Sequence, residues 1–260
     1  MSGQVALVTG ASGGIGWAIA EVLAEHGHDL LLVARSAPRL EERAEAIAAQ
    51  HGIRCDWMAA DLASEDGANA VLDAVTRRGC VVDLLVNNAG ALHEGDFLDV
   101  PLERHESLVS LNVLGVMRLT HPLARQMRDR NAGRILNIAS TSAFNPVPSL
   151  ASYAASKAFL LSFSEALGME LSGTAVTVTA SCPGFTNTGM IEQEGRKPMQ
   201  LPVIPNLEPR AVAEHSYAAC MRGEPVTVPG LLNRLSSATL RRVPGWLRRR
   251  AITMIKDRGI

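Results

Sequence analysis

The chain has almost no net charge and few aromatic side chains. Its 260 residues include 25 Lys and Arg against 26 Asp and Glu, a formal net charge of −1, and aromatic residues make up 4% of the total. Because nucleic-acid-binding chains are usually strongly basic, this balance argues against such a role for the chain as a whole. The hydrophobic fraction of 47% also excludes a chain that is disordered throughout.

Long apolar runs, a secretory leader and paired cysteines are missing too. No apolar run approaches the roughly 20 residues of a membrane-spanning helix. Residues 1–9 lack a basic region followed by an apolar stretch, so we expect a cytoplasmic protein. Four cysteines occur, none in a CxxC pair and none beside a histidine at metal-ligand spacing. We therefore expect neither disulfides nor a metal site, and we interpret the cysteines as small buried residues.

What the sequence does contain is an alternation of short apolar runs with helical stretches. The expected strands are Val5–Val8, Leu30–Val33, Cys55–Ala60, Leu84–Val86, Ile135–Ile138, Val176–Ala180 and Val226–Val228. The expected helices are Ile15–Glu25, Pro38–Gln50, Ser64–Arg77, Leu102–Arg130, Tyr153–Leu171 and Pro209–Met221. This alternation predicts a doubly wound, three-layer Rossmann-type α/β fold around a mostly parallel seven-stranded sheet. Residues 1–230 are expected to form one such domain.

A glycine-rich turn joins the first strand to the first helix. Residues without a Cβ let the backbone approach a pyrophosphate, and the helix that follows directs free N–H groups at the same place. The alternative is a tight strand–helix connection without a ligand. The position of the glycine-rich turn in the first strand–turn–helix unit favours dinucleotide binding. The residues assigned to it are Gly10, Ser12, Gly13, Gly14, Ile15 and Gly16.

The end of the second strand indicates which dinucleotide is bound. An NAD site usually has an acid there, whereas this chain has Ala34 followed by Arg35. A guanidinium can form a strong charge-assisted pair with a 2′-phosphate, and Ser36 and Arg39 can assist it. The alternative is a solvated surface arginine. We expect NADP(H) as the cofactor, in preference to NAD(H).

Tyr153 and Lys157 stand four residues apart on an expected helix, so they share one face. A neighbouring ammonium favours the phenolate and should lower the pKa of the phenol, which then exchanges a proton with a carbonyl or alcohol oxygen. Ser140, at the end of the preceding strand, can hold that oxygen by a hydrogen bond. The alternative is an ordinary pair on a helix surface.

Taken together, these motifs resemble those of the short-chain dehydrogenase/reductase family over nearly the whole chain. They are Thr9-Gly10-(x)3-Gly14-x-Gly16, Asp61, Asn87-Asn88-Ala89-Gly90, Asn112, Ser140, Tyr153-(x)3-Lys157 and Pro183-Gly184. The resemblance implies that Tyr153 is the general acid or base and that Lys157 lowers its pKa and binds the nicotinamide ribose. It further implies that Ser140 orients the substrate and that Asn112 holds a water in a proton path to Lys157.

The same resemblance implies further cofactor contacts. Asp61 would bind the adenine amino group, and Leu62 would contribute backbone. Thr188 would bind the carboxamide and fix the nicotinamide face. The remaining implied contacts are Asn88, Ala89, Gly90, Pro183, Gly184 and Thr186.

The substrate is less well defined by the sequence. Residues 185–209 correspond to the family's substrate lid, and their apolar content favours an apolar carbonyl or alcohol. A 3-oxoacyl thioester, a steroid-like ketone and a small aldehyde or ketone all remain open. His93 is interpreted as a polar wall of the pocket in preference to a second acid. The alternative to an NADP(H)-dependent oxidoreductase is a non-catalytic NADP(H)-binding protein that senses redox state or contacts partners.

The last thirty residues, 231–260, carry seven Arg and one Lys against one Asp. Mixed with Leu and Trp, these charges are typical of a basic amphipathic segment that lies on the body, on a second subunit or on an anionic membrane surface. We favour protein packing over membrane contact. From the resemblance we expect a homodimer or homotetramer formed through the helices around Leu102–Arg130 and Tyr153–Leu171.

Overall fold

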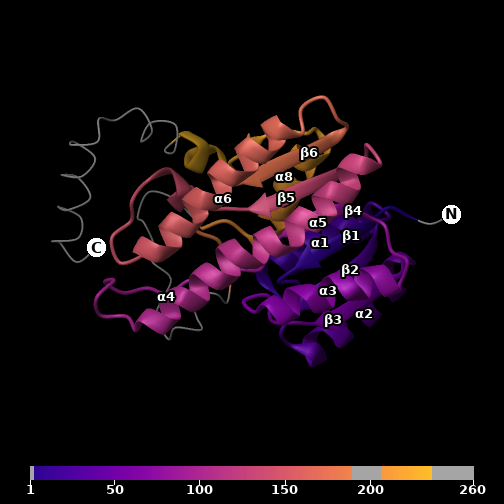
Figure 1. Ribbon diagram of the computed structural model, residues 1–260, viewed down its shortest axis with the longest axis horizontal. Coiled ribbons are helices and arrows are strands. Elements are labelled where there is room, and N and C mark those ends of the chain that lie inside the picture. The colour runs from indigo at the N-terminus through magenta and orange to yellow at the C-terminus, as the bar shows by residue number, and fades with distance from the viewer. Residues whose placement is uncertain (1–2, 189–205, 236–260) are drawn as a thin grey trace.

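The computed structural model describes residues 3–188 and 206–235. Figure 1 shows a central sheet enclosed between helices. Its seven strands lie in the order β3-β2-β1-β4-β5-β6-β7, and every neighbouring pair is parallel. The strands are β1 Val5–Thr9, β2 Asp29–Ala34, β3 Cys55–Ala59, β4 Val82–Asn87, β5 Gly133–Ile138, β6 Val176–Ser181 and β7 Val226–Thr227. The predicted doubly wound Rossmann-type fold is confirmed.

Helices cover both faces of this sheet. They are α1 Gly14–Glu25, α2 Ala37–His51, α3 Glu65–Arg77, α4 Leu102–Val109, α5 Val116–Asp129, α6 Ala151–Glu170 and α8 Pro209–Met221, with a 3₁₀ turn η2 at Thr141–Phe144. Residues of α1, α2 and α8 share one hydrophobic cluster with the sheet, and residues of α3, α5 and α6 share another. Because both faces are covered, an inner strand such as β2 is buried at every position and is apolar from Leu30 to Ala34.

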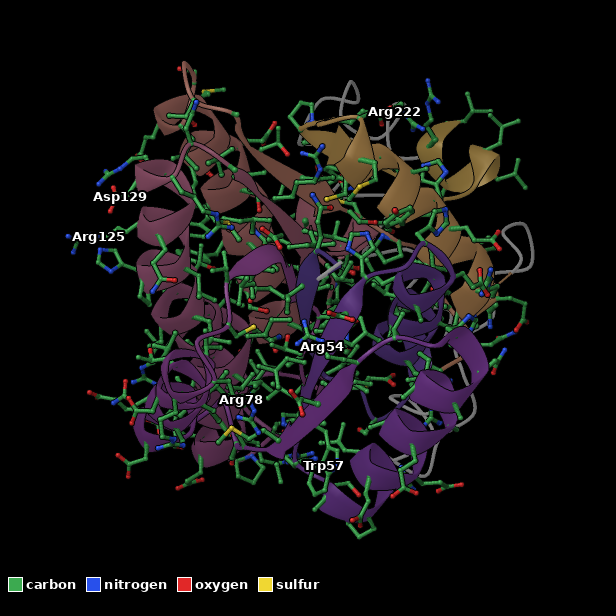
Figure 2. The ribbon with its side chains drawn as sticks, turned by 90° about the vertical axis from the view of Figure 1, so that its right-hand side faces the viewer. Arg54, Trp57, Arg78, Arg125, Asp129 and Arg222 are labelled. Atoms are coloured by element: carbon green, nitrogen blue, oxygen red, sulfur yellow. The ribbon has the colours of Figure 1, made fainter. Side chains whose placement is uncertain are left out.

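The edge strand β3 is held to the sheet partly by charge. Arg54, just before β3, donates to the Asp29 carboxylate from its backbone N–H at 2.9 Å and from Nη2 at 2.6 Å. Trp57, in the middle of β3, packs on the cluster of α1, α2 and α8. Figure 2 shows Arg54 and Trp57 on this side of the molecule. A charged side chain beside an open edge makes it less suitable for pairing with another strand.

Element positions agree with the sequence prediction, with one departure. The stretch predicted as a single helix over Leu102–Arg130 is interrupted by a π-helical segment, η1, at Ser110–Gly115. Within it Asn112 is buried, and Gly115 lies so near Leu62 that a Cβ there would come 2.5 Å from the Leu62 carbonyl oxygen. Wider turns of this kind are frequent at functional sites.

Much of the expected lid and tail, residues 189–205 and 236–260, lies outside the described residues. Of the helices that are described, none is both long and apolar enough to cross a membrane.

Candidate active site

The glycine-rich turn lies where β1 ends and α1 begins, and its glycines differ in what surrounds them. Gly10 and Gly14 have φ values of 67° and 55°, in the left-handed region that favours glycine. A Cβ on Gly16 would collide with the Gly10 carbonyl oxygen and the Asn88 amide. A Cβ on Gly13, by contrast, would meet nothing within 4 Å. This open space at the N-terminus of α1 fits a dinucleotide pyrophosphate, which the free N–H groups there would bind.

Thr9 ties this turn to the neighbouring strand; it begins the predicted glycine motif but was assigned no role of its own from the sequence. Its Oγ1 accepts from the backbone N–H groups of Asn88 and Ala89, both at 3.0 Å, and donates to the Val86 carbonyl at 3.1 Å. The Asn88 side chain donates in turn to the carbonyls of Thr9, at 3.0 Å, and Gly10, at 3.3 Å. Asn88 therefore supports the turn with its side chain. A hydroxyl residue that ends a buried strand directly before the glycines is the signal that would have identified Thr9.

The residues predicted to bind the adenosine half of the cofactor follow two neighbouring strands: Arg35 and Ser36 come after β2, Arg39 lies in the first turn of α2, and Asp61 comes after β3. Arg35 and Arg39 are exposed, and neither has an ion-pair partner among the described residues. Ser36 precedes α2 but makes no capping hydrogen bond with its side chain, so its hydroxyl is available. Two cations and a hydroxyl fit a 2′-phosphate. Asp61 is exposed, and its Oδ1 accepts from the Ala63 N–H at 3.0 Å, so the other carboxylate oxygen remains for a ligand such as an adenine amino group.

Tyr153 and Lys157 lie in the first two turns of α6, next to the ends of β5 and β6. Lys157 is 6% exposed, its Nζ donates to the Ile138 carbonyl at 2.8 Å and it lies 5.7 Å from the centre of the Tyr153 ring. Burial lowers the pKa of Lys157 to about 8. Ser140, the residue after β5 and Ala139, is buried and holds the η2 turn by accepting from the Ser142 N–H at 3.1 Å.

The sequence-based expectation for the Tyr153 pKa requires correction. Desolvation raises the pKa of this phenol, and a hydrogen bond with Ser140 acts in the opposite direction. The net shift is upward because desolvation is the larger of these two contributions. In the cofactor-free chain, therefore, Tyr153 is a protonated acid at neutral pH.

Asn112 connects the π-helical segment to the loop after β4. Its Oδ1 accepts from the Ala91 N–H at 2.8 Å, and its Nδ2 donates to the Ala91 carbonyl and to Ser156 Oγ, both at 3.0 Å. Both amide hydrogens are thus used within the protein. The water that the family resemblance implies at Asn112 would therefore have to donate a hydrogen bond to the Asn112 Oδ1 atom. A Cβ on Gly90 would lie 3.3 Å from Asn112 Oδ1 and 3.6 Å from Lys157 Nζ, which places Gly90 beside both residues.

Residues 184–188, at the described start of the expected lid, lie against the glycine-rich turn. Thr186 is buried and donates to the Gly184 carbonyl at 3.0 Å, and Thr188 Cγ2 would lie 3.2 Å from a Cβ on Gly14. The described start and end of the expected lid are joined by a hydrogen bond, in which the Asn187 N–H donates to the Leu207 carbonyl at 2.9 Å. Asn233 occupies the space beside Gly184, where a Cβ would be 2.5 Å from Asn233 Oδ1. Asn233 was not predicted, because nothing near it in the sequence shows that it reaches the lid.

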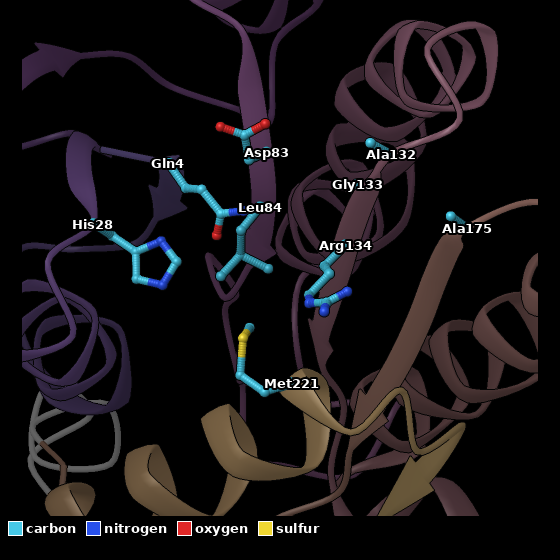
Figure 3. A pocket seen from close by; sticks show the side chains of 9 residues that line it. All are labelled: Gln4, His28, Asp83, Leu84, Ala132, Gly133, Arg134, Ala175 and Met221. Atoms are coloured by element: carbon cyan, nitrogen blue, oxygen red, sulfur yellow. The ribbon is translucent and has the colours of Figure 1, made fainter. Parts of the chain in front are cut away.

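One cavity in the described part of the chain lies away from these residues. It has a volume of about 290 Å³ and is lined by residues that include His28, Asp83, Arg134 and Met221. Figure 3 shows Asp83 and Arg134 near the starts of β4 and β5, and Met221 at the end of α8. This is the amino-terminal edge of the sheet, opposite the glycine-rich turn and Tyr153. None of the predicted site residues lines this cavity.

Comparison with known proteins assigns the class. A family model described as short chain dehydrogenase matches residues 4–198, well over half of the chain. The chain therefore belongs to the short-chain dehydrogenase family and is an oxidoreductase, as its motifs predict.

Individual relatives of known or assigned type are similar to most of the chain. The chain is 39% identical over 189 residues to a putative ketoacyl reductase of Streptomyces coelicolor, covering 72% of each protein. It is 35% identical over 190 residues to a 3-oxoacyl-(acyl-carrier-protein) reductase of Aquifex aeolicus, covering 73% of this chain and 77% of the relative. A solved short-chain dehydrogenase from Sphingobium yanoikuyae in complex with NADPH superposes with a TM-score of 0.82 at 31% identity, over 93% of this chain and 96% of the other.

Proposed function

We propose that the chain is an NADP(H)-dependent reductase of ketones and that 3-oxoacyl thioesters are its favoured substrates. The observation that carries the proposal is the proximity of buried Lys157 to Tyr153, next to Ser140 and at the same sheet edge as the open glycine-rich turn. The reductases of 3-oxoacyl substrates among the relatives support the substrate class.

The bound cofactor supplies the hydride, and the residues of the chain supply the proton and the orientation. Ser140 donates a hydrogen bond to the substrate carbonyl oxygen and holds it near Tyr153. The protonated Tyr153 hydroxyl gives its proton to that oxygen as negative charge develops on it. Lys157 donates to ribose hydroxyls and stabilises the phenolate that remains.

Cofactor selection is proposed to follow from charge at the end of β2. Arg35 and Arg39 would pair with the 2′-phosphate of NADPH, and the Ser36 hydroxyl would donate a hydrogen bond to it. Gly10, Gly13 and Gly14 let the pyrophosphate approach the N-terminus of α1. The NADPH in the structure of the Sphingobium yanoikuyae relative supports this choice of cofactor.

One experiment tests these proposals together. NADPH and NADH binding is measured by fluorescence titration for the wild type, Arg35→Ala and Tyr153→Phe, followed by turnover of a 3-oxoacyl thioester, a steroid-like ketone and a small ketone. We expect the wild type to bind NADPH at least about tenfold more tightly than NADH, a difference of about 1.4 kcal/mol that Arg35→Ala removes. Tyr153→Phe should bind NADPH as the wild type does and lose turnover.

Other outcomes lead to definite conclusions. Preference for NADH would contradict the role of Arg35. Wild-type binding of NADPH without turnover of any ketone would favour the non-catalytic, redox-sensing alternative. If the steroid-like or the small ketone were turned over fastest, that ketone would be the favoured substrate class and the proposal of 3-oxoacyl thioesters would be wrong.

We also propose a cytoplasmic homo-oligomer in which α6 contributes to the interface. From Ala155 to Met169 the exposed residues of α6 carry no charge, and the exposed Glu170 follows at the end of the helix; these uncharged residues are Ala155, Phe159, Ser162, Ala166 and Met169. A helix that is apolar on its outer face as well as its inner face is normally covered by another element. For the basic extension 231–260 we propose packing on protein in preference to a membrane surface. The contact of Asn233 with Gly184, at its start, supports this choice.

A further inference from the structure

His105 connects two segments that flank the candidate active site. It lies in the first turn of α4 and is 7% exposed. Its Nε2 is 3.2 Å from the Phe97 carbonyl oxygen, and its Nδ1 is 2.9 Å from Ser152 Oγ. A carbonyl oxygen can only accept, so Nε2 donates to Phe97, and in the neutral ring Nδ1 then accepts from the Ser152 hydroxyl. The Phe97 ring stacks on the imidazole, with centroids 4.6 Å apart.

The two segments that His105 joins are the loop 91–100 and the start of α6. The loop begins at Ala91, which Asn112 holds, and Ser152 directly precedes Tyr153. A second contact joins the same segments, because Gly95 N–H donates to the Ser149 carbonyl at 2.9 Å and Ser149 Oγ donates to Asp96 at 2.8 Å.

The start of α6 depends on such contacts. Its N-cap residue, Leu150, has no side chain that can cap the helix, and Ser149 is held at a φ of 61°, which is uncommon for a residue other than glycine. The local sequence therefore does little to fix the first turn of α6. The direction of the Tyr153 phenol depends on that turn, because Tyr153 is the third residue of the helix.

We propose that His105 is a positioning residue, which sets the place of the Tyr153 hydroxyl through its hydrogen bond with Ser152. It does not touch the reacting atoms. This inference rests on the proposed ketone reduction for its kinetic consequence, whereas its structural consequence is independent of the substrate.

The variants separate the two hydrogen bonds of His105 from its packing. His105→Phe keeps a ring against Phe97 and removes both bonds. His105→Asn can reach as far as the position of Nδ1 and so retains the Ser152 bond, whereas His105→Gln can reach as far as Nε2 and so retains the Phe97 bond. Ser152→Ala removes the link from the other side, and Ser172→Ala, exposed just after the end of the same helix, is its matched control.

We expect His105→Phe, His105→Gln and Ser152→Ala to lower kcat/KM for the ketone by about tenfold, with the Kd for NADPH unchanged. His105→Asn and Ser172→Ala should stay within about twofold of the wild type. The double variant His105→Phe/Ser152→Ala should lose no more than either single variant, because both break one link. Amide hydrogen exchange in residues 149–155 should be faster in His105→Phe than in the wild type.

A purely structural role would instead lower the melting temperature of all His105 variants alike and leave kcat/KM of the folded enzyme unchanged. That result, or additive losses in the double variant, would overturn the inference. Wild-type enzyme that reduces no ketone would refute the proposed function. The exchange measurement would then decide the role of His105 by itself, and unchanged exchange in residues 149–155 would overturn it.

Discussion

Lys157 places a basic group in the protein interior, and this has a consequence for stability at the scale of a single residue. Burial lowers its pKa from 10.5 to about 8. Because the folded value is below the unfolded one, the unfolded chain binds more protons between these pH values, and stability rises with pH across this window. Below pH 8 the buried charge costs on the order of 3 kcal/mol, which the hydrogen bond to Ile138 offsets by about 1 kcal/mol.

We therefore expect Lys157→Met to be more stable than the wild type by about 2 kcal/mol at pH 7, while it loses turnover. For a chain of this size that corresponds to a rise of about 4–8 °C in the melting temperature. The difference should shrink as the pH rises from 8 towards 10.5. Thermal melts of the cofactor-free proteins across pH 6–10 check this, with Tyr153→Phe as the control that keeps the lysine. Equal melting temperatures at pH 7 would contradict it.

At the scale of elements, two glycines of the turn between β1 and α1 are needed for different reasons, one for folding and the other for ligand binding. Gly16 is closed in by the Gly10 carbonyl and the Asn88 amide, so its missing Cβ is needed for packing. Gly13 has an extended backbone, with φ of 177°, that any residue can adopt, and the space beside it is open. Only a ligand in that space would require glycine at position 13.

Gly16→Ala should therefore lower the free energy of unfolding by about 1–3 kcal/mol. Gly13→Ala should leave stability unchanged and weaken NADPH binding by at least about tenfold, or about 1.4 kcal/mol. Thermal melts without cofactor and fluorescence titrations with NADPH measure the two effects separately. Loss of stability in Gly13→Ala, or unaltered NADPH affinity, would show that the open space does not hold the cofactor.

The elements also show how far sequence reasoning reaches. Strand and helix limits could be predicted because local signals mark them, such as Ser64, which caps α3 by accepting from the Gly67 N–H at 3.0 Å. The π-helical segment could not, because it depends on contacts of Gly115 with Leu62 and of Asn112 with Ala91, both distant in the sequence.

The same limit applies within the candidate site. The spacing of Tyr153 and Lys157 follows from helical periodicity and was predictable. The raised pKa of Tyr153 and the inward turn of the Asn88 side chain were not, because desolvation and side-chain direction depend on the assembled sheet edge.

At the scale of the whole molecule, the outer stripe of α6 is the surface on which the proposed oligomer depends. Phe159 and Met169 are 36% and 72% exposed, and the exposed residues between them, Ser162 and Ala166, carry no charge. Phe163, one turn from Phe159, stacks on it with ring centroids 5.7 Å apart and widens the apolar surface. Patches of this kind are covered in oligomers, where they supply the apolar centre of an interface.

We expect light scattering coupled to gel filtration to give the wild type a mass that is an even multiple of its 27.7 kDa subunit. The double variant Phe159→Glu/Ala166→Glu should elute as a monomer, because two carboxylates from each copy would be buried without partners. Ala46→Glu, an exposed alanine on α2, is the matched control and should keep the wild-type mass. A monomeric wild type would refute the oligomer, and a double variant of unchanged mass would show that the interface lies elsewhere than on α6.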